Sequence, residues 1–153
     1  EEFKCDTSKA NETLNRLLKQ KMKIQKSKQV AGLKYFAVGL DASDKKLLVK
    51  GGAKGMSTFM SYYILKAVAS YDKKAAIKMM KEYYGAMLDK GATSFWEDFD
   101  IEWTKGSCRI DEFPKAGEKD IHGDFGAFCY KGFRHSLCHG WSAGVIQFIK
   151  EEC

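Results

Sequence analysis

Aromatic rings and carboxylates lie side by side in the ten residues from Gly91 to Asp100, whose sequence is GATSFWEDFD. The flat apolar face of an aromatic ring can lie against a sugar ring, and carboxylates can hold sugar hydroxyls or transfer protons. The stretch follows a glycine at the end of a predicted helix, and loops on a rigid scaffold often present reactive groups. This composition therefore indicates carbohydrate chemistry.

Glu97 is the strongest candidate for chemistry in this stretch, because Trp96 could provide an apolar wall that suits a carboxyl group to acid/base work. The pattern leaves open a Glu97 side chain that faces solvent or accepts hydrogen bonds from backbone amides. Neighbouring side chains alternate in an extended segment, so Asp98 is expected to point away from Glu97. We expect Asp98 and Asp100 to form turn bonds or to cap a helix.

A second mixture of polar and aromatic residues, RHSLCHGW, occupies residues 134–141. His139 stands just before a predicted helix, where an imidazole can bond a sugar hydroxyl, orient a carboxylate or cap the helix. Trp141 adds another ring that can face a sugar. The chain has neither the Gly-x-Ser-x-Gly elbow of a Ser-His-Asp hydrolase nor a phosphate-binding loop, so neither of those functions is expected.

The cysteines and histidines form no recognisable metal site. No two of the five cysteines have CxxC spacing, and an odd number in a chain of 153 residues is typical of reduced, buried thiols. The residues considered as zinc ligands have spacings that match no familiar site; they are Cys108, His122, Cys129, His135, Cys138 and His139. We therefore expect no metal and no other cofactor.

The net charge of +6 comes almost entirely from lysine, since the 26 basic residues include only three arginines, Arg16, Arg109 and Arg134. Recognition of phosphates and bases favours arginine forks. The lysines at residues 19–28 share their segment with apolar residues at helical spacing, which predicts a solvated helix face. We expect no nucleic-acid partner. We also expect no membrane partner, because no apolar run approaches the roughly 20 residues that span a bilayer.

The elements that must hold these groups are predicted helices. Apolar side chains recur at three- and four-residue spacing in four segments, residues 14–22, 30–40, 56–68 and 76–88. Residues 6–8 offer N-caps for the first helix, Asp72 caps the fourth, and Gly91 takes the position of its C-terminal glycine. Ser43 is expected to cap a short helical turn between the second and third segments.

The predicted helices indicate an all-α fold. The short Tyr71-Asp72 link is expected to join two of them into an antiparallel hairpin. Residues 92–136 carry no helical pattern but hold many aromatic residues, which predicts one long, aromatic-rich loop instead of disorder. A final helix is expected from His139 or Gly140. Repeated hairpins suggest a layered or toroidal arrangement in a single domain over residues 1–153.

Three stretches resemble the C-terminal part of the catalytic domain of bacterial α-L-rhamnosidases. They are residues 50–63 around GGAKGMSTFM, YYGAMLDKGATSFWE at residues 83–97, and SLCHGWSAG at residues 136–144. The similarity runs in order over roughly residues 30 to 150, and the Gly-Ala-Thr…Trp-Glu element is its specific part. The resemblance implies an α/α toroid of six-hairpin glycosidase type that hydrolyses terminal α-L-rhamnosides with inversion.

By motif position, the resemblance implies that Glu97 is the general base and His139 a substrate-binding histidine. Trp96 would wall the apolar face of the sugar, and Trp141 is placed with it in the substrate-binding set. Such a toroid needs more helices than this chain supplies, and the general acid of the family lies upstream of these residues. We therefore expect the C-terminal portion of a larger catalytic domain, inactive alone and prone to self-association through exposed helix faces.

Two other functions stay open. Another α/α-toroid glycosidase, for example one that acts on uronides, would need several arginines in its pocket, and the three arginines here are poorly placed. A non-catalytic helical interaction module would need no cleft that joins Trp96, Glu97 and His139, and it would keep its function without Glu97.

Overall fold

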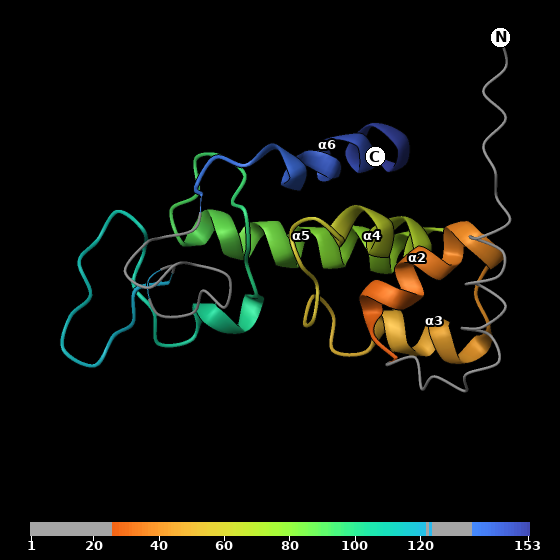
Figure 1. Ribbon diagram of the computed structural model, residues 1–153, viewed down its shortest axis with the longest axis horizontal. Helices are drawn as coiled ribbons and strands as arrows, with labels where there is room; N and C mark the ends of the chain where they lie inside the picture. The colour runs from red at the N-terminus through yellow and green to blue at the C-terminus, as the bar shows by residue number, and fades with distance from the viewer. Residues whose placement is uncertain (1–25, 122, 124–135) are drawn as a thin grey trace, which may run out of the picture.

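The computed structural model describes residues 26–121, 123 and 136–153, and the helix predicted at residues 14–22 lies outside them. The described residues form five α-helices and no β-strand, which confirms the all-α class. The α-helices are α2 (Lys28–Val38), α3 (Ala42–Val49), α4 (Ser61–Ala69), α5 (Lys73–Asp89) and α6 (Gly144–Glu152) (Figure 1). None of the described helices is long and apolar enough to cross a bilayer.

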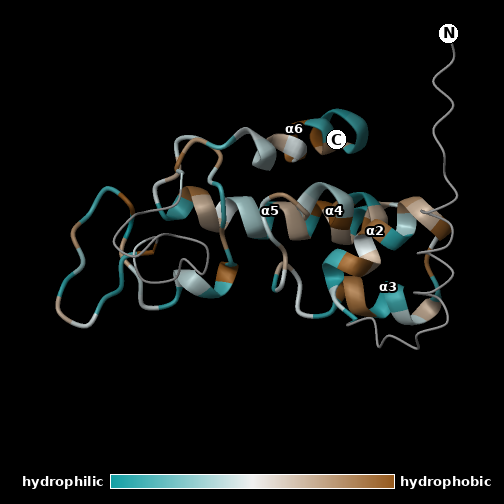
Figure 2. Ribbon diagram, in the orientation of Figure 1, coloured by the Kyte–Doolittle hydropathy of each residue, from teal (hydrophilic) through white to brown (hydrophobic). Residues whose placement is uncertain are grey.

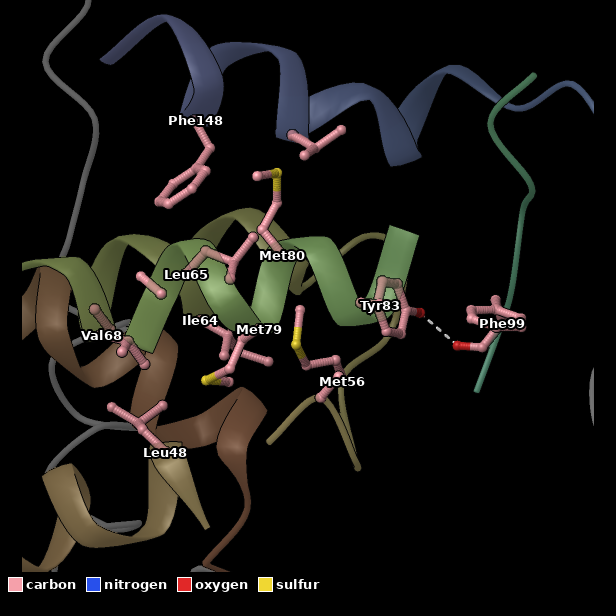
Figure 3. Packing of buried hydrophobic residues seen from close by; sticks show 14 of the residues in the cluster. Leu48, Met56, Ile64, Leu65, Val68, Met79, Met80, Tyr83, Phe99 and Phe148 are labelled. Carbon is pink, nitrogen blue, oxygen red and sulfur yellow. Dashed lines mark hydrogen bonds between the residues drawn. The ribbon is translucent and has the colours of Figure 1, made fainter. Parts of the chain in front are cut away.

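The short helix α4 lies at the centre of the fold, where it contacts α2, α3, α5 and α6. Its side chains Ile64, Leu65 and Val68 are fully buried, and Figure 3 shows them among the core side chains. Gly32 lets α2 approach α4 closely, because a Cβ there would lie 3.1 Å from the backbone nitrogen of Ile64. Figure 2 shows hydrophobic residues along α4 and on parts of α2 and α5.

The predicted hairpin is formed by α4 and α5. Asp72 caps α5 as expected, since its carboxylate accepts a hydrogen bond of 2.9 Å from the amide of Ala75. Ser61, at the start of α4, shares a 2.7 Å hydrogen bond with the hydroxyl of Tyr84 in the second half of α5. Contact between the start of one helix and the latter half of the next shows that the two run antiparallel.

Gly91 ends α5, as the sequence predicts. It takes a φ of 93°, and its amide and that of Ala92 donate to the carbonyls of Leu88 and Met87. This pattern satisfies carbonyl groups that the last helical turn leaves without partners. The loop that follows therefore departs from a fixed point on α5.

Three predictions about where helices begin are wrong. The third helix begins at Ser61 instead of Met56, since Gly51, Gly52 and Gly55 take positive φ values and turns occupy residues 50–55 and 58–60. The cap of α3 is Asp41 and not Ser43, since the Asp41 carboxylate accepts hydrogen bonds from the amides at positions 43 and 44. The final helix is preceded by the 3-10 helix η2 (Gly140–Ala143), so α6 itself starts four residues later than expected.

The long loop packs against the core through its aromatic residues. Within its described part, Trp96 and Phe99 are fully buried, and the hydroxyl of Tyr83 on α5 donates a hydrogen bond to the Phe99 carbonyl (Figure 3). Asp100 caps the 3-10 helix η1 (Ile101–Thr104) by accepting a hydrogen bond from the amide of Glu102, which confirms its expected capping role. The hydrogen bond from Tyr83 thus holds the loop against the C-terminal half of α5, the helix that precedes the candidate site.

Candidate functional site

The two mixed aromatic and polar stretches of the sequence meet in space. The amide of Glu97 donates to the carbonyl of Ser136 at 2.9 Å, and the amide of His139 donates to the carbonyl of Phe95 at 2.7 Å. The Ser142 hydroxyl donates to the carbonyl of Trp96. Residues 95–97 and 136–142 are therefore held side by side through their backbones, although about 40 residues of chain separate them.

A pocket of about 280 Å³ opens beside Glu97. Its lining comes from the turn before α4, from the long loop and from η2: Ser57, Thr58, Phe59, Met60, Glu97, Asp98 and Trp141. The side chains of Phe59 and Trp141 are 48% and 49% exposed, and their ring centroids lie 5.9 Å apart. Glu97 and Asp98 thus border a small depression beside two aromatic rings, and the surface of the depression is almost entirely apolar, which suits the apolar face of a sugar ring.

Glu97 is held through both its backbone and its side chain. Its carbonyl oxygen accepts hydrogen bonds from the Thr58 hydroxyl and, at 2.7 Å, from the indole Nε1 of Trp141. Its carboxylate oxygen Oε2 accepts a hydrogen bond of 2.9 Å from the amide of Ser136. The sequence left open a carboxylate that bonds a backbone amide, and this contact is present, but the residue also lines the pocket.

Asp98 is also among the residues that line the pocket. The chain bends at Glu97, and alternation of side chains holds only in an extended segment. The local turn bond expected for Asp98 is present, because its Oδ1 accepts a hydrogen bond of 2.9 Å from the amide of Phe99.

Trp96 does not face the pocket, and its expected role as the wall of a sugar site needs correction. Its side chain has no exposed surface, and its ring packs edge-to-face on Phe99 with centroids 5.6 Å apart. A large apolar ring gains more free energy in the core than at the surface. Trp141, from the second stretch, lies beside Glu97 in its place.

His139 lies against the ring of Trp141, with centroids 4.4 Å apart. It stands at the N-cap of η2, but its side chain makes no capping hydrogen bond there. His139 is not among the described residues that line the pocket. The structure therefore brings His139 to Trp141, which in turn contacts Glu97.

Phe59 and Thr58 are site residues that the sequence pattern missed. The spacing assigned Phe59 to the buried stripe of a helix, whereas it belongs to the turn before α4 and is 48% exposed. The three glycines at positions 51, 52 and 55 were the available signal, because glycines at this density are typical of turns.

Glu97 and Asp98 are the acidic residues among the described lining of the pocket, no lysine or arginine is among them, and the exposed surface of the pocket is almost entirely apolar. In the described part of the chain no group of three or more His, Cys, Asp and Glu residues could hold a metal ion. Cys108 is buried there, and Cys138 and Cys153 are exposed thiols. His122, Cys129 and His135, which the sequence analysis considered as ligands, lie outside the described residues.

Comparisons with protein-family models, with curated proteins and with solved structures found no match to this chain. The functional argument therefore depends on the geometry of the Glu97 pocket and on the motifs that meet there.

Proposed function

We propose that this chain is the C-terminal portion of an inverting glycoside hydrolase similar to the α-L-rhamnosidases, with Glu97 as its general base. One observation carries the proposal. The two motifs of the resemblance meet at backbone hydrogen bonds, and together they bring Glu97 and the exposed ring of Trp141 to one pocket.

In this proposal Glu97 accepts a proton from the water that attacks the anomeric carbon of the sugar. A carboxylic acid on the opposite face, about 6.5–9.5 Å away, protonates the leaving oxygen. That acid and the helices that would complete an α/α toroid lie outside this chain. The hydrogen bond from the Ser136 amide orients the Glu97 carboxylate, and the ring of Trp141 supports the apolar face of the sugar.

A neutral sugar suits the pocket better than a uronide does. The surface of the pocket is almost entirely apolar, Glu97 and Asp98 are among its lining residues, and none of the described lining residues is basic. A uronate would place a third negative charge beside these two without a cation to offset it. The alternative of another toroid glycosidase is therefore weaker when its substrate is acidic.

One observation favours the alternative of a non-catalytic interaction module. A second, larger depression of about 640 Å³ lies between α5, residues 92–95 and α6, and its lining is mostly apolar. Such a groove is a feature of surfaces that bind other proteins. A module of this kind would keep its function when Glu97 is replaced.

The test is hydrolysis of an aryl α-L-rhamnoside by this chain and by the longer polypeptide that we expect its gene to encode. We expect negligible turnover by the chain alone, because it lacks the acid. In the longer polypeptide Glu97→Gln should lower kcat by about three orders of magnitude. Glu112→Gln, which changes an exposed carboxylate away from the pocket, is the matched control and should have no effect.

The first product, observed by NMR during turnover, should be β-L-rhamnose because the mechanism inverts the anomeric centre. Retention of configuration, or full activity of the Glu97→Gln variant, would contradict the proposal. The proposal would also be contradicted if the chain is inactive and its gene encodes no further residues.

A further inference from the structure

A continuous row of aromatic rings leads away from the Glu97 pocket across the surface of α4. We call Trp141, Phe59, Tyr63 and Phe36 the aromatic ladder. Its successive ring centroids lie 5.9, 6.0 and 5.6 Å apart. The ladder begins on η2, crosses the start of α4 and ends on α2, which packs against α4.

The ladder is largely exposed. Three of its rings, those of Phe36, Phe59 and Trp141, keep 51%, 48% and 49% of their surface in contact with solvent. Exposed aromatic side chains leave apolar surface in water, and a contiguous set of them marks a binding surface more often than scattered ones do. Stabilisation of the fold does not explain the ladder, because the core is built from other rings, including those of Trp96 and Phe99.

The chemistry along the ladder points to a carbohydrate. Tyr63 adds a hydroxyl group to this apolar surface. The ring of Tyr62 lies beside that of Tyr63, 5.5 Å away between centroids, and the Tyr62 hydroxyl donates to the carboxylate of Glu151. The ladder is continuous with the pocket, since Phe59 and Trp141 belong to both. Aromatic faces with a hydroxyl group among them match the apolar faces and hydroxyls of linked sugars.

We infer that the aromatic ladder is an extended binding surface for a neutral oligosaccharide or polysaccharide, whose terminal sugar occupies the Glu97 pocket. The next sugars along the chain stack on Phe59, Tyr63 and Phe36. This inference rests on the proposed function and adds to it the class of substrate: a rhamnose-terminated glycan of several sugars, in preference to a short glycoside.

The test compares two ligands on the 153-residue chain. L-Rhamnose and a rhamnose-terminated oligosaccharide are titrated by calorimetry, and the indole N–H resonance of Trp141, assigned with Trp141→Phe, reports on the pocket. The oligosaccharide should bind several-fold more tightly than L-rhamnose. Phe36→Ala should weaken oligosaccharide binding about 3- to 10-fold and leave L-rhamnose binding unchanged, since a ring contact contributes about 0.5–1.5 kcal/mol.

Phe113→Ala is the matched control, because Phe113 is 96% exposed in the long loop, away from the ladder, and its loss should change neither affinity. Equal affinity for the two ligands, or an unchanged oligosaccharide affinity in Phe36→Ala, would overturn the inference. In either case, binding of L-rhamnose at Trp141 would still support the proposed function. Absence of binding by both ligands would overturn both. If Phe36→Ala instead changes only the oligomeric state in light scattering, the ladder is a protein interface and the inference is wrong.

Discussion

The indole Nε1 of Trp141 donates a hydrogen bond of 2.7 Å to the backbone carbonyl oxygen of Glu97. The same oxygen also accepts a hydrogen bond from the hydroxyl of Thr58. Two elements distant in sequence, the turn before α4 and η2, therefore hold one peptide group of the long loop. Because its backbone is restrained from both sides, Glu97 is held in place although it belongs to no helix or strand itself.

This shared acceptor predicts non-additive effects on stability. Thr58→Val and Trp141→Phe should each lower the free energy of unfolding by about 1 kcal/mol, because each leaves the Glu97 carbonyl with one donor. The double variant leaves it with none and should lose more than the sum of the two single losses. Urea unfolding of the four proteins measures the coupling, with the exposed Thr93→Val as control. Strictly additive losses would show that the two donors do not share this role.

Substitution by alanine should destabilise the fold at Gly91 and stabilise it at Gly85. Gly91→Ala is expected to destabilise the fold by about 1–2 kcal/mol, because an L-residue is strained at a φ of 93°. Its Cβ would also lie 3.1 Å from side-chain atoms of Ile110 and Asp111. Gly85 lies within α5, and a Cβ there meets no atom within 4 Å. Gly85→Ala should therefore stabilise the protein by roughly 0.5–1 kcal/mol. Thermal unfolding compares the two, and equal effects would contradict this account of the end of α5.

Lys28 should make stability rise with pH in the alkaline range. Its side chain is 7% exposed, its ammonium group donates to the carbonyl of Gly52, and burial lowers its pKa to about 8 while Glu82 opposes that change. Between this value and the unfolded pKa of about 10.4, the unfolded chain binds more protons than the folded one, so folding is favoured as pH increases. The gain should be at most about 3 kcal/mol.

Lys28→Met should remove this pH dependence and should be more stable than wild type at neutral pH, where the buried charge costs free energy. Urea unfolding at pH values from 7 to 10 gives the slopes of both proteins. Lys26→Met, which removes the same charge from an exposed side chain, controls for net charge. Parallel profiles for wild type and Lys28→Met would refute the assignment.

The groove between α5 and α6 should make the chain self-associate. Leu88, Ile146 and Ile149 border it and are 63%, 45% and 44% exposed. Apolar area of this kind is removed from water when two copies meet. Light scattering at micromolar concentration should show a dimer or larger species, and Leu88→Lys with Ile149→Lys should give a monomer. Val38→Lys, at another exposed apolar position, should not. A monomeric wild-type chain would contradict the expectation.

Local patterns predicted most of the helical elements correctly. The spacing of apolar residues located α2 and α5, because side chains three and four positions apart share one face of a helix. The same rule failed before Ser61, where Met56 and Phe59 fit the spacing but lie outside the helix. Periodicity records only which positions are apolar. It does not show whether nearby glycines give the backbone φ values that are incompatible with a helix.

The sequence alone was enough to predict an all-helical chain, the α4–α5 hairpin, the end of α5 at Gly91 and a carboxylate-bearing loop that begins there. These features depend on neighbours within a few positions, so local chemistry decides them. Only the tertiary structure placed Trp96 in the core and Trp141 beside Glu97. Both rings are apolar and lie near polar groups in sequence. Which of them meets solvent depends on hydrogen bonds between residues 95–97 and 136–142, and those contacts join parts of the chain that no local pattern relates.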